Sequence, residues 1–162
     1  MAEAGAGPAR ARRRTRIQAE NEARILEAAL EAFSARGFHG ATLDEIADGA
    51  GLSKPNLLYY FRSKDEVHRA LLTGLLDHWL DPLRALSPDG DPMAELRAYL
   101  RRKLQMSRER PRESRLFARE MLEGAPRLRE VLEGDLRPLV AAKAEVIRAW
   151  GRAGRIRPVD PF

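Results

Sequence analysis

Apolar residues recur every three to four positions along most of the chain, which is the spacing of an α-helix with one buried face. The first such segment runs from about Glu20 to Arg36, and Gly37 follows where the C-cap of a helix takes a positive φ. Its apolar positions are Ile25, Leu26, Ala29, Leu30 and Phe33. The pattern therefore predicts a helix over residues 20–36.

Short capped elements follow between residues 41 and 61. Thr42 and Glu45 form an S/T-x-x-E capping box in front of a short amphipathic helix. Gly51 can take the positive φ of a tight reversal, and Ser53 can cap the helix after it. Two capped helices joined by a glycine-containing turn are the pattern of a helix-turn-helix.

Four longer helices are predicted in the rest of the chain. They cover about residues 63–83, 92–111, 113–123 and 126–150. Capping boxes and first-turn prolines mark their starts. In the last of them Gly134 and Pro138 stand four residues apart, so the proline removes a hydrogen bond to the glycine carbonyl and we expect a kink. Asp160 and Pro161 resemble one more helix start, which predicts an incomplete C-terminal domain; an extended tail is the alternative.

Composition agrees with a fold built from helices. Val, Ile and Thr together number 13 of 162 residues, whereas Ala, Leu, Arg and Glu are the most frequent types. The first three favour strands and the other four favour helices. We therefore expect an all-α protein.

The positive charge is concentrated at the N-terminus. The net charge is +5, and residues 1–16 hold five arginines against Glu3 alone. A flexible arginine-rich arm is suited to the phosphate backbone or the minor groove of DNA. A disordered solubilising tail is the alternative. The candidate DNA-contacting residues of the arm are Arg12, Arg13, Arg14 and Arg16.

The chain lacks the residues that several classes of enzyme need. The chain has no cysteine, and its three histidines do not have metal-ligand spacing with one another. It also lacks a phosphate-binding glycine loop and a serine in a nucleophile elbow. We expect no enzyme, no metal and no cofactor. No apolar run approaches the roughly 18–20 residues that span a bilayer, so we expect a soluble, cytoplasmic protein that does not bind membranes.

The second helix of the helix-turn-helix carries side chains that can read DNA. The major groove, about 12 Å wide, admits one helix, and there Asn56 can pair with adenine and Lys54 with guanine or phosphate. Tyrosines suit phosphate or thymine-methyl contacts, and groups at helix N-termini suit phosphate. The full candidate set is Thr42, Leu43, Ser53, Lys54, Pro55, Asn56, Tyr59, Tyr60 and Lys64. The same turn occurs in helix bundles that do not bind DNA, so the pattern alone leaves both alternatives.

Several runs of residues closely resemble the N-terminal DNA-binding domain of TetR-family transcriptional regulators. The resemblance covers roughly residues 20–72, and its clearest runs are Gly37–Thr42, Ala50–Ser53, Leu57–Phe61 and Ser63–Glu66. Further runs, Trp79–Leu83, Ser114–Phe117 and Glu120–Pro126, are similar to family members that regulate pyrimidine utilisation.

The resemblance implies a domain organisation and a function. It divides the chain into a disordered basic arm (1–18), a DNA-binding domain (19–79) and an incomplete helical ligand-binding and dimerisation domain (80–162). Family members are homodimers that bind a palindromic operator in double-stranded DNA, and an effector changes the spacing of their two recognition helices. The implied function is a ligand-responsive repressor with uracil or thymine as the small-molecule effector. The implied ligand-binding residues are Trp79, Arg115, Phe117 and Met121.

An incomplete dimerisation domain would weaken the homodimer and the two-site binding that depends on it. The alternative function is therefore a truncated helical interaction module that binds DNA only non-specifically, or that acts through a full-length partner. Preference for a palindrome over scrambled duplex separates the two functions, because an arm acting alone binds phosphate regardless of sequence.

Overall fold

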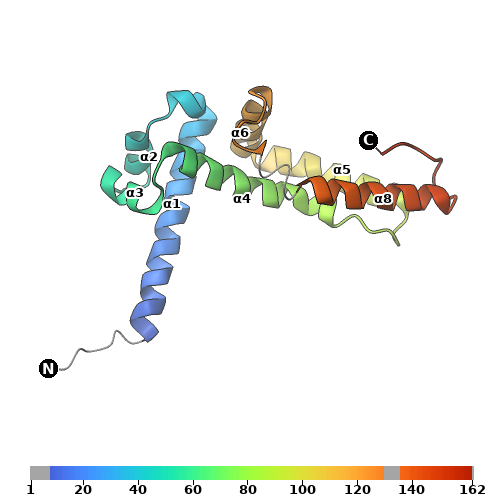
Figure 1. Cartoon of the computed structure of the whole chain (residues 1–162), viewed down its shortest axis with the longest axis horizontal. Helices are drawn as coiled ribbons and strands as arrows, with labels where there is room; N and C mark the ends of the chain where they lie inside the picture. The colour runs from blue at the N-terminus through green and yellow to red at the C-terminus, as the bar shows by residue number, and fades with distance from the viewer. Residues whose placement is uncertain (1–7, 130–135, 162) are drawn as a thin grey trace. The chain divides into compact units, whose positions relative to one another are not determined.

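The computed structural model describes residues 8–129 and 136–161, and all regular secondary structure in these residues is α-helical (Figure 1). This confirms the all-α fold class. The helices are α1 (Pro8–Gly40), α2 (Leu43–Gly49), α3 (Lys54–Tyr60), α4 (Lys64–Arg84), α5 (Pro92–Glu109), α6 (Pro111–Leu122) and α8 (Arg137–Arg152). The chain forms two compact units, Met1–Leu71 and Leu72–Phe162, and their division lies inside α4, before the expected boundary after residue 79.

Helix α1 begins earlier than the sequence pattern predicted. It starts at Pro8 and not near Glu20, so residues 8–18 of the expected disordered arm are helical. Alanine, arginine, glutamine and glutamate favour helix, and no glycine or proline interrupts residues 9–36. The expected end is confirmed, because Gly37 breaks the helix with φ 71° and ψ 177°. The side chains of Arg12, Arg13 and Arg14 lie outside the described residues, and Arg16 forms an exposed ion pair with Glu20 at 3.2 Å.

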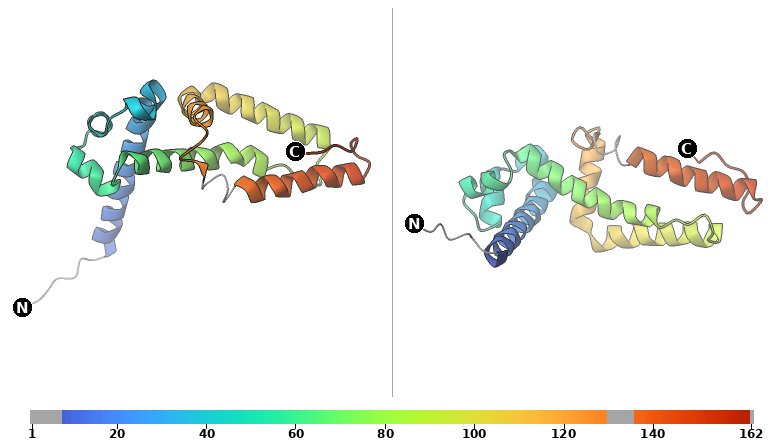
Figure 2. Two further views of the ribbon diagram at one scale, coloured as in Figure 1. Left: turned by 45° about the horizontal axis from the view of Figure 1, so that its top comes forward. Right: turned by 60° about the horizontal axis from the view of Figure 1, so that its bottom comes forward.

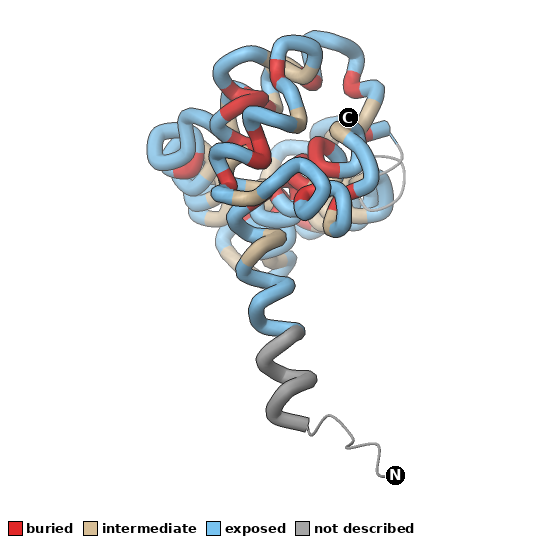
Figure 3. Tube along the Cα trace, turned by 90° about the vertical axis from the view of Figure 1, so that its left-hand side faces the viewer, coloured by how far each residue is buried: buried red, intermediate tan, exposed pale blue. Residues whose placement is uncertain are grey.

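The N-terminal unit is built around the apolar face of α1. Ile25, Ala29 and Phe33 are fully buried, as their spacing predicted. Figure 3 colours buried positions of the chain red. From α4, His68 packs edge-on against Phe33 with ring centroids 4.6 Å apart. Ile46 of α2 and Leu57 of α3 are also fully buried, so each short helix is anchored by an apolar side chain.

In the C-terminal unit, α5 lies beside the C-terminal half of α4, and the N-terminal part of α8 lies near the end of α4 (Figure 2). Lys143 of α8 donates hydrogen bonds to the carbonyl oxygens of Arg84 (2.7 Å) and Leu86 (2.8 Å). The indole of Trp150, only 1% exposed, donates to the carbonyl of Pro88 at 2.8 Å. These bonds fix the loop between α4 and α5 against α8.

Three expectations about the C-terminal half differ from the structure or lie partly outside the described residues. The expected kink lies partly outside the described residues, because Gly134 is among residues 130–135; Pro138 is in the first turn of α8, where its missing N–H removes no intrahelical bond. Residues 126–128 form a turn and not the start of the helix predicted over 126–150. Residues 155–161 form no helix, so the helix start expected at Asp160 is not formed there.

Candidate DNA interface and effector site

Side-chain caps fix the starts of the two short helices. The Thr42 hydroxyl accepts a hydrogen bond from the Glu45 N–H at 3.2 Å, and the Glu45 carboxylate accepts one from the Thr42 N–H at 3.1 Å. The Ser53 hydroxyl accepts from the Asn56 N–H at 3.4 Å. The capping box and the serine cap are both present as predicted. The backbone N–H of Asn56 is used in this cap, whereas its side chain is exposed.

The turn between α2 and α3 depends on one glycine. Gly51 has φ +64°, a conformation that side-chain-bearing residues rarely adopt. The Leu52 N–H donates to the carbonyl of Ala47 at 2.9 Å and closes the turn. A Cβ atom at Gly51 would lie 2.6 Å from a guanidinium nitrogen of Arg24, which reaches the turn from α1. Gly51 therefore sets the angle at which α3 leaves α2.

We expect Gly51→Ala to lower the free energy of unfolding by about 1–2 kcal/mol, the cost of a left-handed backbone for a residue with a Cβ. Gly74→Ala is the matched control. Gly74 lies in α4 with no atom within 4 Å of an added Cβ, so alanine should stabilise the helix by about 0.5–1 kcal/mol. Urea unfolding of both variants measures the two effects. Equal effects of the two substitutions would contradict a strained turn at Gly51.

The surface of α3 divides into a buried and an exposed side. Leu57 is fully buried, whereas Lys54, Asn56 and Tyr59 are exposed, Tyr59 to 78%. Pro55 in the first turn is also exposed. The ammonium of Lys54 is 2.9 Å from a carboxylate oxygen of Asp44, an exposed contact that water and salt screen and that phosphate can replace. The exposed side of α3 is a polar and aromatic surface that can enter a groove.

Three other candidates take part in contacts within the protein. The Tyr60 hydroxyl accepts a hydrogen bond from the side-chain amide of Asn21 at 2.8 Å, and its ring is half-buried. The ammonium of Lys64 donates to the carbonyl of Ala41 at 2.9 Å and lies 4.5 Å from the centroid of the Phe38 ring. Leu43, in the first turn of α2, is half-buried.

In the C-terminal unit, the structure brings together two of the expected ligand-binding residues. The rings of Trp79 (α4) and Phe117 (α6) are stacked, with centroids 5.9 Å apart and an interplanar angle of 12°. The indole Nε1 of Trp79 is buried, and no group in the described part of the chain accepts a hydrogen bond from it. A buried N–H without a partner costs free energy, and a ligand acceptor would remove that cost. This pair is the centre of the candidate effector site.

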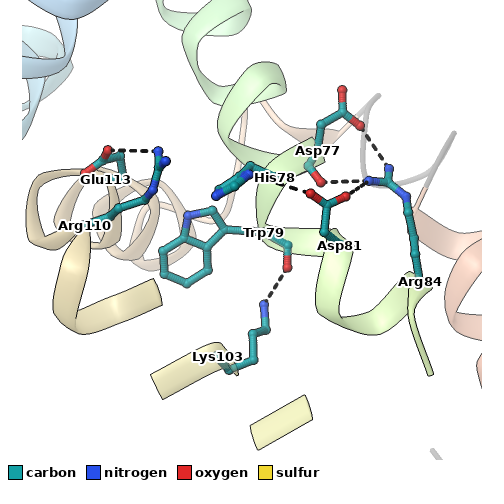
Figure 4. A network of polar contacts seen from close by, with 8 residues as sticks. All are labelled: Asp77, His78, Trp79, Asp81, Arg84, Lys103, Arg110 and Glu113. Carbon is teal, nitrogen blue, oxygen red and sulfur yellow. Dashed lines mark hydrogen bonds and ion pairs between the residues drawn. The ribbon is translucent and has the colours of Figure 1, made fainter. Parts of the chain in front are cut away.

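Lys103 of α5 joins this site, and the sequence pattern gave no sign of it. Its ammonium donates to the carbonyl of Trp79 at 2.9 Å and lies 5.1 Å from the centroid of the indole ring (Figure 4). Burial lowers the pKa of Lys103. Figure 4 also shows Arg110 and Glu113 beside Trp79, and their side chains are 3.6 Å apart.

The other two expected ligand residues lie differently. Arg115 stands two positions before Phe117, hence on the opposite side of α6, and is exposed. Met121 is one turn after Phe117 and is 37% exposed. A separate cleft of about 500 Å³ lies between α4 and α5, and Trp79 is not among its lining residues; they include Pro82, Ala85 and Tyr99.

Within residues 8–129 and 136–161, no group of histidine and carboxylate side chains is arranged to hold a metal ion. No helix in the same part of the chain has the length and apolar character needed to cross a membrane.

Two family models together match most of the chain. The model of bacterial regulatory proteins of the TetR family matches residues 25–71, and the model of the C-terminal region of YcdC-like proteins, also of TetR type, matches residues 72–162. The chain belongs to the TetR family of DNA-binding transcriptional regulators. This confirms the resemblance seen in the sequence, and the function is transcriptional regulation and not catalysis.

Individual relatives agree with this assignment. The chain is 47% identical to the transcriptional regulator RutR of Escherichia coli K12 over 149 residues, which cover 92% of this chain and 70% of RutR. It is 44% identical over 80 residues to the transcriptional activator FasR of Mycolicibacterium smegmatis, covering 49% of this chain and 36% of FasR. Among solved structures, the transcriptional regulator SCO4942 of Streptomyces coelicolor has a TM-score of 0.69 at 29% identity, covering 85% of this chain and 69% of that one.

Proposed function

We propose that the chain is a ligand-responsive repressor that binds a palindromic operator as a homodimer, with α3 in the major groove. The observation that supports the groove contact is the division of α3, with Leu57 fully buried and Lys54, Asn56 and Tyr59 exposed on the other side. Asn56 is the base-reading residue, because its amide presents a donor and an acceptor that match the edge of adenine. Lys54, Tyr59 and the helical N-terminal arm, including Arg16, bind phosphate.

The N-termini of α2 and α4 bind the flanking phosphates in this proposal. Thr42 and Ser53 act mainly through the caps that hold the two short helices in place. Lys64 has three donors and uses one on the carbonyl of Ala41, which leaves donors for a phosphate oxygen. The protein acts on chromosomal DNA and hence in the cytoplasm.

We propose a pyrimidine base, uracil or thymine, as the effector. Support comes from the 47% identity to RutR together with the stacked Trp79–Phe117 pair and its buried, unpartnered indole N–H. A flat ring with carbonyl oxygens suits an aromatic pair and an N–H donor. Met121 lies on the same side of α6 as Phe117 and can line the effector site. Arg115 lies on the opposite side of α6, so it can contact the pyrimidine ring only if its side chain moves toward Phe117.

Fluorescence anisotropy tests the proposed function. The probe is a labelled duplex carrying the upstream region of the protein's own gene, at about 0.15 M salt, where the Debye length is about 8 Å. We expect this duplex to bind at least ~10³-fold more tightly than a scrambled duplex of the same composition. Uracil or thymine should release it, and cytosine should not. Equal binding of both duplexes would contradict a sequence-specific regulator, and release by no pyrimidine would contradict the effector.

A further inference from the structure

Lys103 has an unusual environment for a lysine. The residue is half-buried, and its ammonium lies beside the indole of Trp79, where it donates one hydrogen bond to the Trp79 carbonyl at 2.9 Å. An ammonium has three donors, so the contact with the carbonyl uses one of them. A surface lysine would instead extend into water, since its charge is strongly hydrated.

The carboxylates drawn with Lys103 in Figure 4 are paired with other groups. Glu113 pairs with Arg110 at 3.6 Å, and Asp81 pairs with Arg84 at 3.0 Å and with His78 at 3.6 Å (Figure 4). In the described part of the chain, no carboxylate forms an ion pair with Lys103. A partly desolvated positive charge without a counter-ion destabilises its surroundings, and a bound anion would stabilise it.

Two hydrogen-bond donors beside the Trp79–Phe117 pair can bind an acceptor. The indole N–H of Trp79 is buried without an acceptor, and the ammonium of Lys103 has donors to spare. Both can therefore donate to oxygen or nitrogen acceptors of a ligand. The rings of Trp79 and Phe117 stack on each other, and a flat ligand ring would extend this stack with parallel faces.

We propose that Lys103 is the residue that sets effector specificity: it donates a hydrogen bond to an exocyclic oxygen of a flat ring, and it makes the site prefer an anionic ring to a neutral one. This inference rests on the proposed effector function and deepens it, since it names the chemical class of the ligand. The class is a planar ring with exocyclic oxygen acceptors. Uracil is its neutral member, and barbiturate, which has the same ring and is an anion at neutral pH, is its charged member.

Calorimetric titration of the whole chain with uracil and with barbiturate tests the proposal. The wild-type protein should bind barbiturate about tenfold more tightly than uracil, since hydrogen bonds to charged groups are the stronger ones. Lys103→Gln can still donate to the Trp79 carbonyl but is neutral, and we expect it to reduce this preference to about one. Lys103→Arg keeps the charge and should retain the preference. Arg101→Gln is the control, because Arg101 is exposed on α5 and loses the same charge.

The outcomes separate the two claims. A wild-type preference that Lys103→Gln leaves unchanged would overturn the role of Lys103 while uracil binding supports the proposed effector. A wild-type protein that binds both rings equally would also overturn it. If neither ring binds, the effector class itself is wrong, and the inference fails with it. Melting temperatures identify a variant that has unfolded, and Lys103→Met then provides the second neutral side chain for the same comparison.

Discussion

Asn56→Ala is expected to lower the affinity for the operator by about 10–100-fold and to leave the affinity for scrambled duplex unchanged. The side chain is exposed at the start of α3, and only its backbone N–H takes part in the Ser53 cap. Alanine therefore removes base contacts without weakening the helix start. A bidentate contact to adenine contributes about 1–3 kcal/mol of discrimination, which corresponds to that range of affinity. Anisotropy titrations with both duplexes measure it.

Lys54→Met provides the contrast to Asn56→Ala. A lysine that contacts phosphate should weaken binding to both duplexes alike and reduce the slope of log affinity against log salt by about one. Gln105→Ala, an exposed substitution in the C-terminal unit, should change neither. If Asn56→Ala weakens both duplexes equally, Asn56 does not read a base, and α3 contacts only the backbone.

Trp79→Ala is expected to abolish the response to the effector while operator binding remains. The substitution removes both the ring that stacks on Phe117 and the buried indole N–H. Stacking on an aromatic side chain contributes about 1–3 kcal/mol for a nucleic-acid base, and a hydrogen bond adds about 0.5–1.5 kcal/mol. Together these predict a loss of about 10- to 1000-fold in effector affinity. Calorimetry with uracil, and release of the labelled operator by uracil, measure it.

Two further substitutions of tryptophan show what each part of the side chain contributes. Trp79→Phe keeps a flat ring without the N–H and should lose only the part of the affinity due to the hydrogen bond. Trp150→Phe is the control; it removes the bond to the Pro88 carbonyl, so it should lower the melting temperature and leave effector binding unchanged. An effector response that survives Trp79→Ala would place the effector site elsewhere in the C-terminal unit.

Local signals in the sequence predicted the ends of helices well. Gly37, the Thr42–Glu45 capping box and the Ser53 cap each act within a few residues, and each is present in the structure. The predicted start of α1 near Glu20 is wrong, because α1 begins at Pro8. The charge of the arginines near the terminus favours a flexible arm, but arginine and alanine are also strong helix formers.

Contacts between distant residues could not be predicted in the same way. Lys103 meets Trp79 across 24 positions of the chain, and helical periodicity shows only which side of α5 it occupies. Tyr60 was expected on the DNA-facing side, but its hydroxyl bonds to Asn21, 39 positions away. Only the resemblance to a known family indicates Trp79 as a ligand-binding residue, because a tryptophan on a helix is otherwise more often part of the core. The packing of separate helices decides such contacts, and a single sequence contains no direct record of it.

A hydroxyl-radical footprint of the chain on the upstream region of its own gene, with and without uracil, tests ligand-responsive, sequence-specific binding directly. We expect two protected segments related by a palindrome and separated by about one helical turn or a multiple of it. Uracil should remove the protection of the DNA. At concentrations where the wild-type protein protects the two segments, the Asn56→Ala variant should not protect them. Uniform protection, or protection that neither uracil nor Asn56→Ala changes, would contradict a ligand-responsive, sequence-specific regulator.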